Sequence, residues 1–249
     1  MGAGGGLTRF LGAGVFQVPR LYPIIDRETL DERGIGVGEF AAELAAAGVR
    51  MVQYRDKVGG PQVVLRGAAA VSAAFAGRDC VLVMNDRADL AVLAGWRAVH
   101  VGQGDLGVED VRVVLGTRSR SSAESADERG TQVVGVSTHT AEQVRAVCEP
   151  TSRKNRDVGH PECGPDYVAV GPVFATGTKA DAEPVVGLEG VRRARTLTKR
   201  PLVAIGGITV ENARSVIEAG ADSGAVIGGL FVEGRTVGDV VRDFVRVLG

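Results

Sequence analysis

Two carboxylates follow neighbouring apolar segments of the chain, at positions where buried strands would end. Asp86 comes directly after CVLVMN, and Asp105 lies three residues beyond AVHVG, while the segment MVQYRD and the residue after it supply Arg55 and Lys57. Cations beside paired carboxylates suit a diphosphate held with Mg2+, because this ion binds one or two carboxylates together with substrate phosphates. We therefore expect Asp86 and Asp105 to be metal ligands. The alternative is that each carboxylate caps the helix after it.

A second group of candidate residues is neutral and rich in glycine. Gly206 and Gly207 follow LVAI and precede Thr209, which we expect to cap a helix over VENARSVIEAG. Free N–H groups at a helix start bind phosphate, and glycine lets the ligand come close. We therefore predict a phosphate site here; the alternative is that the glycines only relieve crowding. The polar stretch ATGTKADAEPVVG, which includes Lys179, is interpreted as a lid rather than a plain connector.

The charged residues and the glycine-rich residues could share one site only if the ends of several strands lie together. The chain has eight apolar runs of strand length. They are Leu21–Asp26, Met51–Asp56, Cys80–Asp86, Ala98–Gly102, Val133–Ser137, Tyr167–Phe174, Leu202–Gly207 and Gly224–Gly229. Helical patterns such as EFAAELAAAG separate them. Eight strand-then-helix units predict an α/β fold with a single (β/α)8 TIM barrel; a doubly wound open sheet is the alternative. In a barrel, the C-terminal strand ends share the face that carries the chemistry.

The length allows one or two folded domains, and a single α/β barrel fits it comfortably. The 249 residues are 45% hydrophobic and carry a formal net charge of −1, so we expect no nucleic-acid partner and no membrane surface. No apolar stretch reaches membrane-spanning length. The three cysteines, Cys80, Cys148 and Cys163, lack a metal-binding spacing, which indicates a reduced, cytoplasmic setting. Whether the chain forms a homo-oligomer is left open.

The domain organisation is simple. We expect residues 1–20, which are rich in glycine, to form a disordered leader, and residues 21–249 to form the barrel. Two long polar connections, Thr117–Thr131 and Glu149–Pro165, each follow a helix and are expected on the bottom face. His139 is the histidine whose surroundings look functional, whereas His100 is expected to be a packed, hydrogen-bonded group within a strand.

The chain resembles the thiamine phosphate synthases from about Leu21 to Phe231. The similar stretches are LYPIID, VQYRDK, NDRADLA, VHVGQGDL, GVSTHT, DYVAVGPVFATGTK, VAIGGI and VIGGLF. That family joins a hydroxymethylpyrimidine diphosphate to a thiazole phosphate and releases diphosphate. The resemblance therefore implies a TIM-barrel transferase of thiamine biosynthesis, with Mg2+ as its cofactor and two small-molecule substrates.

The resemblance also implies roles for individual residues. The pyrimidine diphosphate would be bound by Gln53, Tyr54, Arg55, Asp56, Lys57, Asn85, Ser137 and Lys179, with Arg55, Lys57 and Lys179 catalytic. The thiazole phosphate would be bound by Thr176, Gly177, Thr178, Gly207, Ile227 and Gly228. Asp86 and Asp105 match the metal ligands. The chain departs from the family pattern at Asp56 (usually Glu), Gly104 (often Glu), Ala175 (commonly Pro), Gly177 (commonly Ser or Glu) and Gly228 (usually Ser).

Two alternatives of the same fold stay open at this point. One is a thiazole phosphate isomerase, and the other is a non-catalytic regulator that binds thiamine phosphates. The first could lose the diphosphate site, and it is disfavoured by the presence of Arg55, Lys57, Asn85, Asp86, Asp105 and Lys179. Their presence argues less directly against the second, because binding residues alone do not prove turnover.

Overall fold

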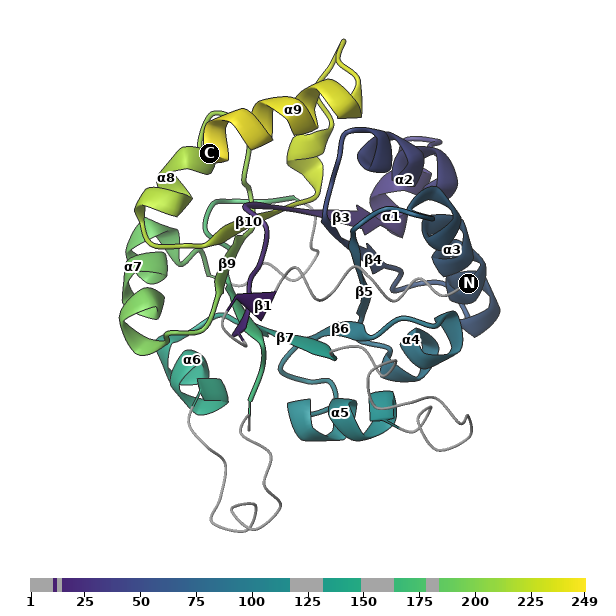
Figure 1. Cartoon of the computed structure of the whole chain (residues 1–249). Helices are drawn as coiled ribbons and strands as arrows, with labels where there is room; N and C mark the ends of the chain where they lie inside the picture. Colours follow the sequence, from purple (N-terminus) through teal and green to yellow (C-terminus); the bar gives the residue numbers. More distant parts are fainter. Residues whose placement is uncertain (1–10, 13–14, 117–131, 149–163, 178–183) are drawn as a thin grey trace.

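Eight parallel strands form a closed barrel in this computed structural model, which describes residues 11–12, 15–116, 132–148, 164–177 and 184–249. The strands are β3 (Leu21–Asp26), β4 (Met51–Arg55), β5 (Val81–Asn85), β6 (Ala98–Val101), β7 (Val133–Thr138), β8 (Tyr167–Val170), β9 (Leu202–Ile205) and β10 (Ser223–Val226). Each pairs with the next along the chain, and β10 closes the ring on β3 (Figure 1). The predicted (β/α)8 barrel is confirmed and the open sheet is excluded.

Helices surround the ring of strands (Figure 1). They are α1 (Arg27–Glu32), α2 (Val37–Ala46), α3 (Pro61–Ala74), α4 (Ala88–Ala94), α5 (Val108–Gly116), α6 (Ala141–Cys148), α7 (Gly187–Leu197), α8 (Ala213–Glu218) and α9 (Val237–Leu248), with a 3-10 turn η4 (Gly228–Leu230). Helix α9 shows why such a segment forms: Thr236 caps it, and Val237, Val240, Val241 and Phe244 recur at helical spacing on its buried face.

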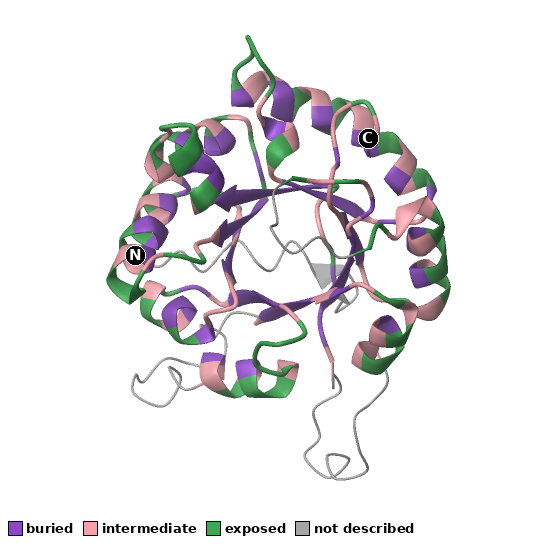
Figure 2. Ribbon diagram, turned by 180° about the vertical axis from the view of Figure 1, so that it is seen from behind, coloured by how far each residue is buried: buried purple, intermediate pink, exposed green. Residues whose placement is uncertain are grey.

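The core has two layers, one between strands and helices and one inside the barrel. Figure 2 shows the strands buried while the outer helix faces are exposed. Alternation along β3 divides the layers, because Ile25 faces the helices while Tyr22 and Ile24 face the interior. Apolar residues on both faces are what a parallel strand between two packed layers requires.

The N-terminal segment differs from our expectation. Leu11–Gly12 (β1) pairs with Val15–Phe16 (β2), and Phe16 is buried in the interior layer, with its ring centroid 6.2 Å from that of Tyr167. A disordered leader reaching residue 20 is therefore wrong at its C-terminal end, because Phe16 finds apolar surface to cover. Residues 1–10 and 13–14 lie outside the described part.

Most strands end within one to three residues of their predicted ends, and β8 is the exception. It stops at Val170, four residues before the predicted end, because Pro172 has no N–H for the ladder. The connection Thr117–Thr131 and nearly all of Glu149–Pro165 lie outside the described residues, as do residues 178–183 of the proposed lid. None of the described helices is long and apolar enough to cross a membrane.

Candidate active site

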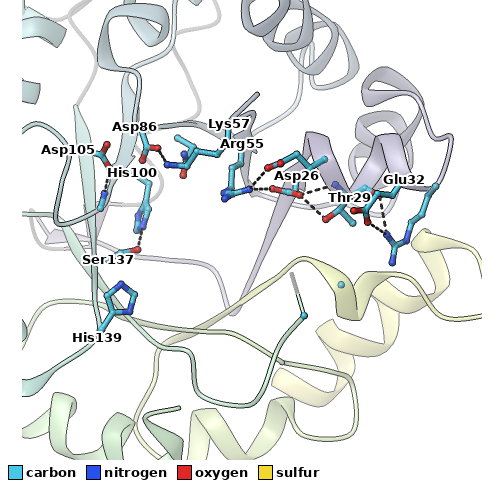
Figure 3. A pocket seen from close by; sticks show the side chains of 16 residues that line it. Asp26, Thr29, Glu32, Arg55, Lys57, Asp86, His100, Asp105, Ser137 and His139 are labelled. Atoms are coloured by element: carbon cyan, nitrogen blue, oxygen red, sulfur yellow. Dashed lines mark hydrogen bonds and ion pairs between the residues drawn. The ribbon is translucent and has the colours of Figure 1, made fainter. Parts of the chain in front are cut away.

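A cavity of about 890 Å3 opens at the C-terminal ends of the strands. Its lining comes from the ends of β3 to β7, the segments after them, the segments after β8 and β10, and helix α1. The lining residues are Asp26, Glu28, Thr29, Glu32, Arg33, Arg55, Lys57, Asn85, Asp86, His100, Gly102, Asp105, Ser137, His139, Gly177 and Gly228. The predicted residues Arg55, Lys57, Asn85, Asp86, Asp105, Ser137, Gly177 and Gly228 are therefore brought together. Figure 3 labels Arg55, Lys57, Asp86, Asp105 and Ser137 among the lining side chains.

Arg55 is held in place by a buried carboxylate. Asp26, 2% exposed, accepts hydrogen bonds at Oδ1 from the backbone N–H and the hydroxyl of Thr29, at 3.0 and 2.7 Å, and so caps α1. Its Oδ2 pairs with the Arg55 guanidinium, which also lies 3.5 Å from Glu28 (Figure 3). Sequence reasoning missed Asp26, although the rule that strand ends carry the chemistry, applied to LYPIID, would have found it.

Lys57 points at Asp86, and the two side chains form an ion pair (Figure 3). Asp86 has a left-handed backbone, with φ of 59°, and its N–H donates to the His100 carbonyl at 2.8 Å. Aspartate tolerates this conformation better than most residues, and strained backbone is common at functional sites. Burial raises the pKa of the Asp86 carboxyl, and Asp105 adds to the rise while Lys57 opposes it.

The two predicted metal ligands do not act as helix caps in the way the alternative required. The cap position of α4 is Arg87, and no side chain caps that helix. Asp105 turns back instead, and its Oδ2 accepts the Gly102 N–H at 2.8 Å. Among the described residues no group of three or more acidic, histidine or cysteine side chains could hold a metal. A pair of carboxylates nevertheless fits Mg2+, which completes its shell with water and phosphate oxygens.

Two histidines line the cavity. His100 Nε2 lies 2.8 Å from the hydroxyl of Ser137, so the expectation of a hydrogen-bonded strand histidine is confirmed, but His100 also reaches the cavity wall. His139 Nδ1 lies 2.6 Å from the carbonyl oxygen of Gly171. Because a carbonyl can only accept, Nδ1 of His139 carries a proton.

Tyr54 and Asp56 do not line the cavity. Alternation along β4 puts Gln53 inside the barrel and Tyr54 on the helix side, where it is fully buried. The Tyr54 hydroxyl donates to Asp56 at 3.1 Å, and Asp56 also accepts the backbone N–H of Gly59 at 2.6 Å. In the structure, these two residues shape the loop after β4, so the implied contact with the pyrimidine diphosphate is not supported by their placement. Gln53 is described below.

On the glycine-rich side of the site, the backbone at Gly207 packs closely against the segment that follows β8. Gly207 has φ of 64°, and a Cβ there would lie 2.5 Å from the Ala175 carbonyl oxygen, so the two segments need glycine to meet. Of the residues predicted for the thiazole phosphate, Gly177 and Gly228 line the cavity, while Thr176, Gly207 and Ile227 are described but are not among the lining residues. Thr178 and Lys179 lie outside the described residues.

The predicted cap at Thr209 is wrong. Helix α8 begins at Ala213, and the cap position is Asn212. The Asn212 side chain accepts the Thr209 N–H at 2.9 Å and donates to the Gly207 carbonyl at 2.9 Å. The glycine pair is therefore followed by a side-chain-bridged turn before the helix, which the apolar spacing alone did not indicate.

A closed barrel with basic and acidic side chains around one cavity at the C-terminal strand ends defines a TIM-barrel protein with a site suited to phosphorylated substrates. The chain belongs to the thiamine monophosphate synthase family, whose model matches residues 21–230. It is 43% identical to the thiamine-phosphate synthase of Koribacter versatilis (strain Ellin345), over 88% of this chain and 92% of that protein.

Two further relatives agree with this assignment. The thiamine-phosphate synthase of Methanoregula boonei is 36% identical over 82% of this chain and 84% of that protein. Among solved structures, thiamine phosphate pyrophosphorylase from Pyrococcus furiosus has a TM-score of 0.69 and 25% identity, covering 92% of this chain and 95% of that chain.

Proposed function

We propose that this protein condenses 4-amino-5-hydroxymethyl-2-methylpyrimidine diphosphate with 4-methyl-5-(2-phosphoethyl)thiazole, forming thiamine phosphate and diphosphate. Membership of the family supports this reaction. The observation that carries it is the grouping of Arg55, Lys57, Asp86 and Asp105 around one cavity. A diphosphate leaving group needs its growing negative charge neutralised, and these cations lie where such a group could bind.

The chain's own residues supply positioning and charge. Arg55 is fixed by Asp26, so its guanidinium needs little reorganisation to meet the diphosphate as charge develops. Lys57, half-exposed on the loop after β4, can turn from Asp86 to a phosphate oxygen. Diphosphate departure would leave a pyrimidinylmethyl cation, which the thiazole nitrogen attacks. No enzymic nucleophile is required, because the barrel has only to hold two partners in line.

Asp86 and Asp105 would hold Mg2+, with diphosphate oxygens and water completing its shell. When bound, the ion supplies further charge neutralisation at the leaving group. The thiazole phosphate would lie in the same cavity, near Gly177 and Gly228. Glycine at these positions leaves room for a phosphate beside the backbone.

Nothing in the site favours either alternative over the synthase. A thiazole phosphate isomerase has no use for a second anion site, which Arg55 and Lys57 would provide in the same cavity as Gly228. A non-catalytic regulator would need the same contacts, so turnover must separate it from a synthase.

One assay tests the proposal. The purified protein is mixed with both substrates and Mg2+, and the formation of thiamine phosphate and diphosphate is followed together. We expect equal amounts of both products, and none when either substrate is omitted. Binding of both substrates without product would instead indicate the regulator.

A further inference from the structure

A line of five hydrogen-bonded side chains crosses the barrel interior and ends at the cavity wall. It runs from Gln53 through Tyr22, Tyr167 and His100 to Ser137, and we call it the interior relay. Nε2 of Gln53 lies 2.9 Å from the Tyr22 hydroxyl, which lies 3.0 Å from the Tyr167 hydroxyl. The Tyr167 hydroxyl lies 3.0 Å from His100 Nδ1, and His100 Nε2 lies 2.8 Å from Ser137 Oγ. Of the five, His100 and Ser137 line the cavity.

The interior relay lies in apolar surroundings. Tyr22 and Tyr167 are almost fully buried among valine, isoleucine and alanine side chains, where an unpaired hydroxyl would lose its hydration without replacement. A Cβ at Gly135 would lie 2.0 Å from Tyr167 Cζ, so the glycine leaves the space that the phenol fills. Burial raises the pKa of both phenols, and each keeps its proton at neutral pH.

The donor–acceptor inventory gives the interior relay a direction. The Gln53 amide nitrogen can only donate, so Tyr22 accepts from Gln53. Either tyrosine hydroxyl could donate to the other, but only donation from Tyr22 to Tyr167 gives the buried Tyr22 proton an acceptor within the interior relay. Tyr167 in turn has its proton for Nδ1 of His100. Nδ1 is then the unprotonated nitrogen, and the neutral imidazole donates from Nε2 to Ser137. The proton of the Ser137 hydroxyl is left to point into the cavity.

We propose that the interior relay holds His100 as the Nε2–H tautomer and thereby presents Ser137 to the cavity as a hydrogen-bond donor. Ser137 then selects an acceptor atom on the ligand, such as a ring nitrogen of an aminopyrimidine or an oxygen of its diphosphate. The opposite tautomer would make Ser137 an acceptor and reverse that selection. The identity of the ligand rests on the proposed function. The tautomer of His100 rests only on the hydrogen bonds of the interior relay. Tyr167 is thus a positioning residue, which acts through His100.

The first test reads the tautomer in the ligand-free protein. Histidine labelled with 15N gives separate signals for the two ring nitrogens, and His139→Gln and His160→Gln variants identify those of His100. We expect a protonated, pyrrole-type shift at Nε2 and a pyridine-type shift at Nδ1. Tyr167→Phe should change this pattern. Tyr54→Phe, which removes an equally buried phenol on the helix side, should not. A proton at Nδ1 in the unsubstituted protein would overturn the proposal.

The second test uses the synthase assay. Tyr167→Phe should raise the KM for the pyrimidine diphosphate about threefold to tenfold, the loss of one net hydrogen bond, with the thiazole phosphate KM within about twofold. Because Tyr167 acts through Ser137, it should add nothing further in a Ser137→Ala background. Additive effects would overturn the positioning role. A protein without synthase activity would refute the proposed function, and the nitrogen shifts would still decide the tautomer.

Discussion

Lys57 and Asp86 form an ion pair between the ends of β4 and β5, with the lysine ammonium against Oδ2 of the carboxylate. The same carboxylate is a proposed ligand of Mg2+. In the ligand-free protein, the lysine and the ion therefore compete for one group. Bound diphosphate gives Lys57 other oxygens to contact, which ends the competition. Metal binding and diphosphate binding are expected to be coupled in this way.

The competition predicts that Lys57→Met binds Mg2+ more tightly than the unsubstituted protein when no substrate is present. The expected gain is at most about fivefold, because a partly exposed ion pair contributes roughly 0.2–1 kcal/mol. Calorimetric titration with MgCl2 measures it. Lys199→Met, at an exposed lysine on the other end of the barrel, is the matched control. Weaker Mg2+ binding by Lys57→Met would contradict the competition.

Asp105→Asn should lower kcat at least ~100-fold, the scale seen when support for a metal site is lost. The asparagine oxygen can still accept the Gly102 N–H, so the fold should persist. Steady-state assays with Mg2+ measure the loss, and Asp110→Asn on the exposed face of α5 is the control. Full activity of Asp105→Asn in the presence of a chelator would refute the metal assignment.

Lys179→Ala should cost roughly 2–4 kcal/mol of transition-state stabilisation, the amount lost with one preorganised charge-stabilising group. The reason is that Lys179 follows β8 and would reach the diphosphate from the proposed lid. The ratio kcat/KM for the pyrimidine diphosphate reports the effect, with Lys199→Ala as control. Unchanged kinetics would place Lys179 in solvent.

Gly228→Leu should block binding of the thiazole phosphate, because Gly228 lines the cavity just after β10. Gly228→Ser should lower the thiazole phosphate KM, since one hydroxyl bond to a charged group contributes about 1.5–3 kcal/mol at most. The KM for the pyrimidine diphosphate should hardly change in the serine variant. Normal turnover of thiazole phosphate by the leucine variant would show that Gly228 does not border that substrate.

Cys80 should react slowly with alkylating reagents in the folded protein. Burial raises the pKa of its thiol, and Asp79 adds to the rise, so less of the reactive thiolate is present at neutral pH. In a Cys148→Ser/Cys163→Ser variant, we expect alkylation at least ~10-fold slower than after unfolding in urea. Equal rates in the two states would show that the thiol is not protected.

The barrel was predictable because each strand is an apolar run bounded by a helical pattern, and LYPIID even gives the bounds of β3. Strand ends likewise pointed to Arg55, Asn85 and Asp86. The loop after β4 was harder, because treating VQYRDK as one binding segment ignored the alternation that turns Tyr54 outward.

The interior relay was not predictable from spacing. Tyr22 and Tyr167 stand within apolar runs and are indistinguishable there from ordinary core residues. Their hydroxyls meet because of the register in which distant strands close the ring, which local sequence does not encode. His100 was expected to be a packed, hydrogen-bonded strand residue, but its partners could not be named, since Ser137 and Tyr167 lie on other strands.

Gly135 and Tyr167 occupy one volume between them, since any side chain at position 135 would overlap the phenol ring. No single replacement of Gly135 fits beside Tyr167, because even the methyl group of alanine would overlap the phenol ring. A larger residue at 135 becomes acceptable together with a smaller one at 167, which would also remove a hydroxyl from the barrel. The two positions are expected to change jointly in descendants of this sequence, and the partner chosen at 167 would decide whether His100 keeps its orientation.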